Sequence, residues 1–132
     1  MTQEEKTLLL QDLCGRLLYG VFVEYDYGDG VKRATKFHGN YLYLMMIGSL
    51  QWKDFKPYLR PMSSMTEKEL KEFSYTILQQ PDLDAVRNWQ TISIDLKELS
   101  KVLDWLNKKM LDYRDLIEKG LALEAPEDMY NV

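Results

Sequence analysis

The fold is decided by a stretch in the first half of the chain: VFVEYDY at 21–27, GDG at 28–30 and VKRATKF at 31–37. In the first segment, Val21, Val23, Tyr25 and Tyr27 alternate with Phe22, Glu24 and Asp26, which is the pattern of a half-buried β-strand. The glycines that follow predict a turn, so the two flanking segments are expected to form a β-hairpin.

Two registers are open for this hairpin. A two-residue loop would place Val23 opposite Lys36. A three-residue loop, with Gly30 left-handed in a bulge, places Val21 opposite Phe37. We favour the three-residue loop, because a slip of one residue would mix the two faces of the hairpin.

A third strand is expected after the hairpin. The second turn is His38-Gly39-Asn40, and the run Tyr41–Ile47 that follows is apolar on both faces. A strand without alternation is usually covered on both sides, so we interpret this run as a central or helix-covered strand. A helix is the alternative, but the flanking Gly39-Asn40 and Gly48 favour a short strand. Residues 48–65 are expected to be irregular, because Pro57 and Pro61 interrupt regular pairing.

Helices are expected on both sides of these strands. Thr2 and Glu5 form a capping box at the start of the chain, and Gly15 is expected to end that first helix. Thr66 and Glu69 form a second capping box. The expected helices are residues 3–14, 67–79, 96–110 and 113–119. The leucine stripe of the third spans only two heptads, so packing within the chain is favoured over a dimer seam.

Together these elements predict a single α+β domain over residues 1–132. Its sheet is a small three-stranded antiparallel meander, which could close into a barrel, packed by an N-terminal helix and C-terminal helices. The tail at 121–126 is expected to lie as an edge strand, with a frayed end. A chain of 132 residues that is 45% hydrophobic and 29% charged can support one packed core.

A single cysteine, Cys14, and a single histidine, His38, limit the chemistry. They exclude an internal disulfide, a cysteine-based zinc cluster and a His-rich metal site. We expect Cys14 to be a small buried residue and His38 a solvated turn residue. Glu24 and Asp26 share a strand face, and we interpret them as ion-pair partners of lysines across the hairpin. The sequence therefore predicts a protein that is not an enzyme and holds no cofactor or metal.

The net charge of −4 is unevenly distributed. The first 66 residues hold 8 basic and 7 acidic side chains, and the remainder hold 9 and 14. The whole chain is thus a poor electrostatic match for nucleic acid or an anionic membrane. No apolar run approaches the ~20 residues of a membrane span, and the start lacks the pattern of a signal peptide. We therefore expect a cytoplasmic protein without a membrane partner.

The stretch at 52–60 is the most suggestive of function, because aromatic and basic side chains interleave there. The residues are Trp52, Lys53, Phe55, Lys56, Tyr58 and Arg60. Such residues make hot spots of protein interfaces, and they also stack bases and bind phosphates in single-stranded nucleic acid sites. A structural interpretation is favoured over either role, in which the rings pin the loop to the sheet while the cations reach solvent.

The leading functional hypothesis is a non-enzymatic binding or accessory protein that contacts a protein partner through this stretch. Tyr58 and Arg60 are its best candidates for partner contacts. The alternative is a small nucleic-acid-binding module that uses the same residues, with binding that falls steeply with salt.

Several specific segments carry a resemblance. They are Gln11–Leu17 with Tyr19–Val21, Lys56–Thr66, and Asp104–Asn107 with Asp112–Pro126. As a set, covering roughly a third of the chain, they resemble small uncharacterised proteins of gut Bacteroides-type bacteria, often encoded in prophages or other mobile elements. Asp115 stands where a glycine is usual in that ending. The resemblance implies a bacterial cytoplasmic protein of mobile-element origin, and it brings no activity, cofactor or catalytic residue.

Overall fold

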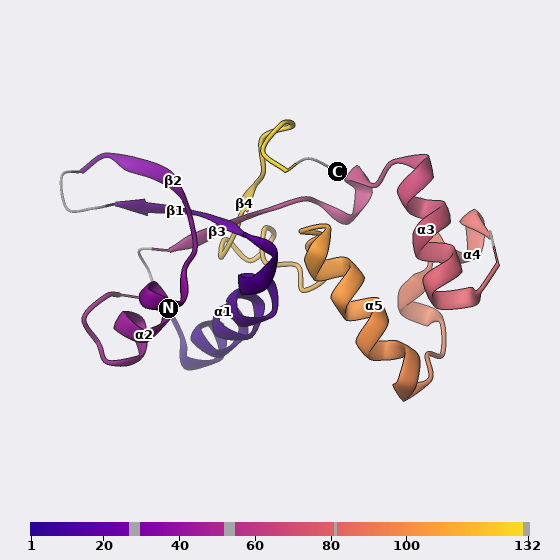
Figure 1. The fold of residues 1–132 in the computed structure, drawn as a ribbon, viewed down its shortest axis with the longest axis horizontal. Helices are drawn as coiled ribbons and strands as arrows, with labels where there is room; N and C mark the ends of the chain where they lie inside the picture. Colours follow the sequence, from indigo (N-terminus) through magenta and orange to yellow (C-terminus); the bar gives the residue numbers. More distant parts are fainter. Residues whose placement is uncertain (27–29, 52–54, 81, 131–132) are drawn as a thin grey trace.

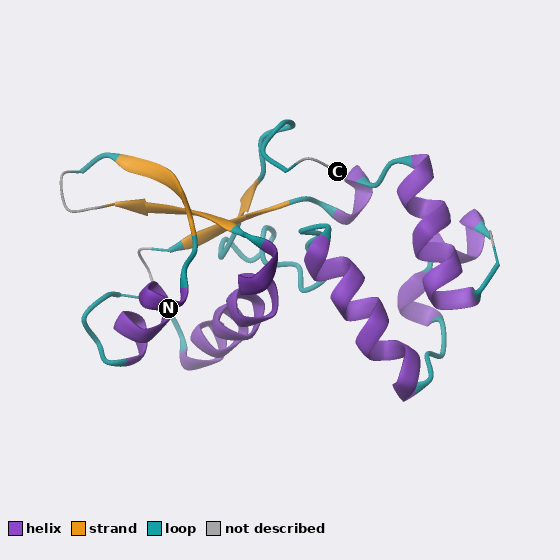
Figure 2. Ribbon diagram, in the orientation of Figure 1, coloured by secondary structure: helices purple, strands orange, loops and turns teal. Residues whose placement is uncertain are grey.

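The structure is a computed structural model that describes residues 1–26, 30–51, 55–80 and 82–130. Within these residues it has an α+β architecture with five α-helices and a four-stranded sheet (Figure 1, Figure 2). The elements are α1 (Gln3–Arg16), β1 (Phe22–Asp26), β2 (Lys32–Lys36), α2 (Gly39–Met46), β3 (Lys56–Leu59), α3 (Glu67–Leu78), α4 (Leu83–Arg87), α5 (Leu96–Lys108) and β4 (Leu123–Glu124). Short 3-10 turns occur at Leu17–Tyr19, Met62–Ser64 and Trp89–Thr91.

The capping box at the start of α1 is confirmed, but the predicted end of the helix is wrong. The Glu5 N–H donates to the Thr2 hydroxyl, and the Thr2 N–H donates to the Glu5 carboxylate, both at 3.1 Å. The helix runs on through Gly15 to Arg16. Gly15 is a packing position: a Cβ added there would lie 3.1 Å from Asn107 Nδ2 of α5. The absent side chain therefore lets α1 and α5 approach each other.

The β1–β2 hairpin has the predicted register of the three-residue loop. Phe22 lies opposite Lys36, and the Phe37 N–H donates to the Val21 carbonyl at 2.9 Å. Gly30 is left-handed, as predicted, with φ of 79°. Residues 27–29 of the loop lie outside the described part of the chain. Val21 and Phe37 are buried, so burial of one face is what sets the register.

The prediction of a strand at Tyr41–Ile47 is wrong, because this run belongs to helix α2. A short apolar run has no periodicity that separates a strand from a helix. Gly48 lies just past the end of this helix, with φ of 82°. Its N–H donates to the Met45 carbonyl, and the Ser49 N–H donates to the Leu44 carbonyl. These bonds satisfy the last carbonyls of a helix.

Strand β3 lies between β1 and β4, so the prediction of an irregular segment over 48–65 is wrong at this point. Pro57 is opposite Val23. In the β1–β2 hairpin every second residue of β1 bonds to β2, and Val23 is one of these, so its N–H and C=O groups face β2 and not β3. The Pro57 nitrogen therefore points away from β1. Its missing N–H costs no bond to that neighbour, which is the position where a strand tolerates proline.

The sheet is open and mixed, which corrects the expected three-stranded antiparallel meander and the expected closure into a barrel. Among the described residues the strand order is β2-β1-β3-β4, with β3 and β4 parallel and the other neighbours antiparallel. β4 confirms the predicted edge strand within 121–126. Helices α1 and α2 lie on one side of the sheet, and α3, α4 and α5 gather beyond the end of β3 (Figure 1).

The predicted short helix at 113–119 is also wrong, because the chain makes consecutive turns there. The buried carboxylate of Asp112 accepts the N–H groups of Leu116 and Ile117, each at 2.9 Å. Asp115 has φ of 59°, a left-handed conformation that glycine adopts most readily. A single side chain thus organises this segment through bonds to its backbone.

The core consists of two hydrophobic clusters. The first joins α1, α2 and the sheet, and its buried residues are Leu9, Leu13, Val21, Val23, Phe37, Met45, Phe55, Leu59, Met110, Leu116, Leu121 and Ala122. The second joins α3, α4 and α5 through Phe73, Val86, Val102, Leu106 and Leu111. Met110 and Leu111 are consecutive residues that belong to different clusters. Cys14 is exposed, so the prediction that it is buried is wrong.

Candidate functional site

One side of the sheet, opposite α1, brings part of the predicted site together with residues of the hairpin. Val23 and Leu59 point into the core, so their strand neighbours point the other way. We call this surface the outer sheet face; its residues are Phe22, Glu24, Lys32, Lys36, Lys56 and Tyr58. Two of the six residues predicted at 52–60, Lys56 and Tyr58, lie here.

The side chains of the outer sheet face form a chain of contacts. The Tyr58 hydroxyl donates to Glu24 Oε2 at 3.4 Å, and Lys32 Nζ lies 3.8 Å from Glu24 Oε1. Partial burial and the neighbouring Glu24 carboxylate raise the pKa of Tyr58. Lys36 Nζ lies 5.8 Å from the centre of the Phe22 ring. The face thus combines two rings, three lysines and a carboxylate on one surface.

Phe55, a third residue of the predicted stretch, is fully buried in the core. Its ring stacks on Tyr25 with centroids 4.5 Å apart, and it meets Phe37 edge to face at 5.9 Å. This agrees with the structural interpretation of the stretch, in which a ring pins the chain to the sheet. Trp52 and Lys53 lie outside the described residues.

Arg60, a fourth member, is held in a two-pronged ion pair with Glu69. Its two terminal nitrogens donate to the Glu69 carboxylate oxygens at 2.9 and 2.7 Å. They also donate to the carbonyls of Lys109 and Ser64. Burial alone would raise the pKa of Glu69, but the bonds from Arg60 and the Thr66 N–H hold that pKa below its usual value. Arg60 therefore joins β3 to α3 and α5.

Tyr130, near the end of the chain, bonds to the backbone of two residues of the outer sheet face, and sequence reasoning missed it. The Phe22 N–H donates to the Tyr130 hydroxyl at 2.9 Å, and that hydroxyl donates to the Tyr58 carbonyl at 2.8 Å. If the pairing of β1 with β3 continued by one residue, Phe22 would lie directly opposite Tyr58. The Tyr130 hydroxyl therefore bridges the two strands at the point where their direct hydrogen bonding ends. Burial raises the pKa of Tyr130 to about 12. The expectation of a frayed end therefore fails at Tyr130, and no local pattern could have revealed this contact.

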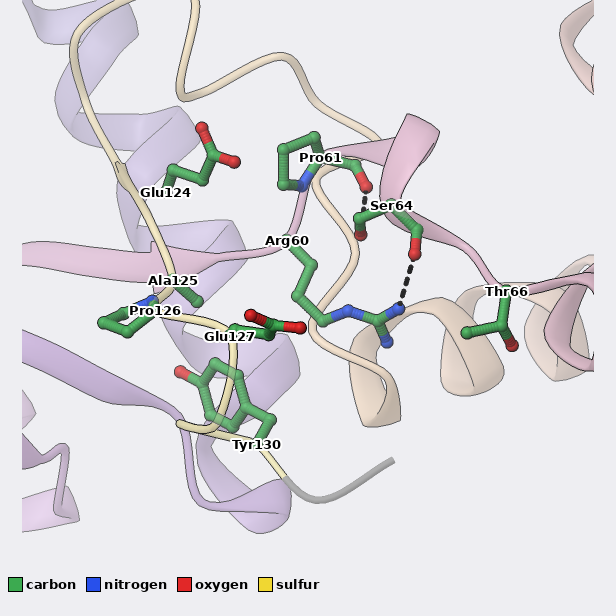
Figure 3. A pocket seen from close by; sticks show the side chains of 9 residues that line it. All are labelled: Arg60, Pro61, Ser64, Thr66, Glu124, Ala125, Pro126, Glu127 and Tyr130. Carbon is green, nitrogen blue, oxygen red and sulfur yellow. Dashed lines mark hydrogen bonds between the residues drawn. The ribbon is translucent and has the colours of Figure 1, made fainter.

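A hollow of about 410 Å³ lies between the end of β3 and the C-terminal segment (Figure 3). Its lining residues are Arg60, Pro61, Ser64, Thr66, Glu124, Ala125, Pro126, Glu127 and Tyr130. The Arg60 charge is already matched by Glu69, and the remaining charged lining residues are the two acids Glu124 and Glu127. The hollow is therefore a poor site for an anionic ligand.

Glu24 and His38, a carboxylate and an imidazole that acid–base chemistry could use, lie in separate parts of the fold. Glu24 is engaged with Lys32 and Tyr58, and His38 is an exposed residue just before α2. In the described part of the chain, no group of three or more His, Cys, Asp or Glu side chains is arranged to hold a metal ion. These positions therefore offer no assembled acid–base pair.

A buried charge cluster links α1 to the segment after α5. The Asp12 carboxylate accepts Arg16 Nε at 3.0 Å with one oxygen and Arg114 at 2.8 Å with the other. Arg16 also donates to the Leu111 carbonyl at 2.7 Å, and both guanidinium groups lie over the ring of Tyr113. Asp12 and Arg16 are fully enclosed, so this cluster supports the fold and is closed to a ligand.

Comparison with protein-family models, curated proteins and solved structures finds no match for this chain. Within the described residues, each helix is too short or too polar to pass through a lipid bilayer.

Proposed function

We propose that this chain is a non-enzymatic binding protein that contacts a protein partner through the outer sheet face. The observation that supports this most directly is the meeting of Lys56 and Tyr58 with Phe22 and Lys36 on one surface. The rings give such a surface contact area, the lysine stems cover apolar surface beside them, and tyrosine is enriched at interface hot spots. On the basis of the resemblance of its segments, we also propose that the protein is bacterial and cytoplasmic, and that its gene belongs to a prophage or other mobile element.

The proposal departs from the sequence hypothesis in the residues that it uses. Phe55 and Arg60 are committed to the fold, so we assign neither of them to partner contact. Phe22 and Lys36, which are distant in sequence from 52–60, take their place. Tyr58 remains the central residue, because its ring is half-buried and its hydroxyl is held by Glu24.

Nucleic acid is the second candidate, and it is favoured by the three lysines, Lys32, Lys36 and Lys56, beside two aromatic rings. Glu24 counts against it. This carboxylate lies among the lysines, where it would repel a phosphate backbone but could accept hydrogen bonds from a protein. A protein partner is therefore the better match.

The test is site-specific photo-crosslinking in bacterial cells. A photoreactive amino acid at position 36 should capture a discrete protein, and the same residue at position 71 of α3 should not. The double variant Lys56→Ala/Tyr58→Ala should reduce capture at least tenfold. The matched control, Lys71→Ala/Tyr75→Ala, replaces an exposed lysine and tyrosine on α3 and should leave capture unchanged.

Equal capture by the two double variants would contradict the assignment of the outer sheet face. A gel-shift titration with single-stranded oligonucleotides tests the second candidate. Binding that appears at low salt and falls steeply as salt is raised would favour nucleic acid over protein.

A further inference from the structure

Strand β2 forms one edge of the sheet among the described residues, and its backbone is laid out to accept another strand. The Phe37 N–H donates to the Val21 carbonyl, so Phe37 and Val21 are a hydrogen-bonded pair of the hairpin. Hydrogen-bonded pairs recur at every second residue of an antiparallel ladder, so Thr35 and Arg33 also bond to β1. The backbone N–H and C=O groups of Lys32, Ala34 and Lys36 therefore point outward from the sheet. The strand has neither proline nor a bulge, and four of its five residues are exposed.

The side chains of β2 give this edge a strong positive charge. Lys32, Arg33 and Lys36 are cationic, and the strand contains no acid. Lys32 reaches Glu24 only at 3.8 Å, and with 67% of its side chain exposed this contact contributes little. Because sides alternate along a strand, Lys32 and Lys36 flank one face of the edge and Arg33 flanks the other.

We infer that the β2 edge binds an extended acidic segment of a partner protein as an added strand. Main-chain hydrogen bonds to the outward groups of Lys32, Ala34 and Lys36 would hold the segment, and carboxylates placed opposite the three cations would select it. The inference shares Lys32 and Lys36 with the outer sheet face, but it does not rest on the proposed function. The bonds that would hold the added strand come from outward backbone groups of β2, which contact through Lys56 and Tyr58 does not use.

A second copy of the chain fits this edge poorly. If two β2 strands paired antiparallel about Ala34, Lys32 of each copy would lie opposite Lys36 of the other. Like charges directly opposite one another destabilise a strand pair. The same lysines that discourage self-association would attract an acidic strand, so charge complementarity favours a different, acidic partner.

The experiment uses the full chain and a fluorescent probe peptide, Ser-Glu-Thr-Val-Glu-Glu-Ser, in a fluorescence anisotropy titration. Aligned antiparallel, this peptide places a glutamate opposite Lys36, Arg33 and Lys32. We expect saturable binding, and at least tenfold weaker binding for the same peptide with lysine in place of each glutamate. Absence of binding, or equal binding of the two peptides, would overturn the inference.

Ala34 offers a variant that separates backbone from side-chain recognition. Ala34→Pro removes an outward N–H while leaving the bonds to β1, and it should weaken binding of the acidic peptide at least tenfold. Ala34→Val keeps that N–H and should bind within twofold of wild type. Equal affinity of these two variants would show that the charges bind the peptide without strand addition, and would overturn the inference.

Amide hydrogen exchange supplies a readout that is independent of the proline variant. On saturation with the acidic peptide, exchange should slow at Lys32, Ala34 and Lys36, whose N–H groups point outward. Arg33 and Thr35 are the internal controls, because their N–H groups already face β1. Unchanged exchange at the three outward amides would contradict strand addition, whatever the folding of Ala34→Pro.

Discussion

Arg16 Nε lies 3.0 Å from Asp12 Oδ2, one helical turn away on α1, and neither side chain reaches solvent. The second Asp12 oxygen accepts Arg114, so one carboxylate pairs with two guanidinium groups. Removing one member of a buried ion pair leaves the remaining charge without compensation, which costs far more than the pair itself contributes. The cluster is therefore the most sensitive point in the contact between α1 and the segment after α5.

Asp12→Ala is expected to lower the free energy of unfolding by about 3–5 kcal/mol, because Arg16 would remain buried and unpaired. Urea denaturation at pH 7 measures this loss. Asp84→Ala is the matched control, since Asp84 pairs with Arg87 at 3.3 Å on the surface of α4. A surface pair contributes less than about 1 kcal/mol. Similar losses for the two variants would contradict the role assigned to the buried cluster.

The ion pair between Arg60 and Glu69 predicts a pH dependence of stability. The pKa of Glu69 is lower in the folded state than in the unfolded state, so the unfolded chain binds a proton first as the pH falls. The stabilisation is present at pH 7 and is lost as the pH falls through the folded-state pKa. The difference in free energy of unfolding between wild type and Glu69→Gln should therefore shrink from pH 7 to pH 3. A constant difference would contradict this prediction.

Tyr130→Phe is expected to cost about 1–3 kcal/mol at pH 7, because the Phe22 N–H and the Tyr58 carbonyl lose their bridge. Thermal unfolding measures the change. Tyr75→Phe, at an exposed tyrosine of α3, should change stability by less than about 0.5 kcal/mol. A Tyr130→Phe effect as small as this control would show that the bridge contributes nothing.

The same hydroxyl predicts a loss of stability in alkali. The folded-state pKa of Tyr130, about 12, lies above the ordinary value of 10.0. The unfolded chain therefore loses this proton first as the pH rises above 10, and folding is weakened progressively up to pH 12. Tyr130→Phe should lose less stability than wild type between pH 9 and pH 11, as measured by urea denaturation. An equal loss in the two proteins would contradict the prediction.

Gly15→Ala tests the close approach of α1 to α5. Replacing glycine by alanine inside a helix raises stability by about 1 kcal/mol through helix propensity. At position 15, however, the added Cβ would lie 3.1 Å from Asn107 Nδ2. Asn107 accepts the Tyr113 hydroxyl at 3.0 Å, which restrains it. We expect Gly15→Ala to destabilise wild type and to stabilise Asn107→Ala. A double-mutant cycle by urea denaturation measures this coupling, and additive effects would refute it.

Asp115→Gly is expected to raise the free energy of unfolding by about 0.5–1 kcal/mol, because Asp115 has φ of 59° and glycine adopts this conformation without a steric cost. Lys101→Gly, at an exposed position inside α5, should instead lower stability by about 0.7 kcal/mol. Thermal unfolding of both variants measures whether stability rises in Asp115→Gly and falls in Lys101→Gly. A loss of stability in Asp115→Gly would contradict the prediction.

The sequence by itself determined the features that depend on neighbouring residues or on a strict alternation. Thr2 with Glu5 and Thr66 with Glu69 mark helix starts, because each box satisfies its bonds within four residues. The hairpin register also followed from sequence, since a slip of one residue would expose Val23. Part of the candidate site was accessible in the same way, because Lys56 and Tyr58 belong to a recognisable aromatic and basic stretch.

Only the tertiary structure decided the rest, because the deciding contacts join residues that are distant in the chain. Tyr41–Ile47 is apolar enough for a strand or a helix, and packing selected the helix. In the sequence Arg60 has the pattern of a surface cation, and only the fold shows that it pairs with Glu69. Tyr130 reaches Phe22 across more than a hundred residues, and such a contact leaves no local pattern. Local hydrogen bonds and alternation can be read from a sequence, whereas the choice of partner for a ring or a charge requires the assembled fold.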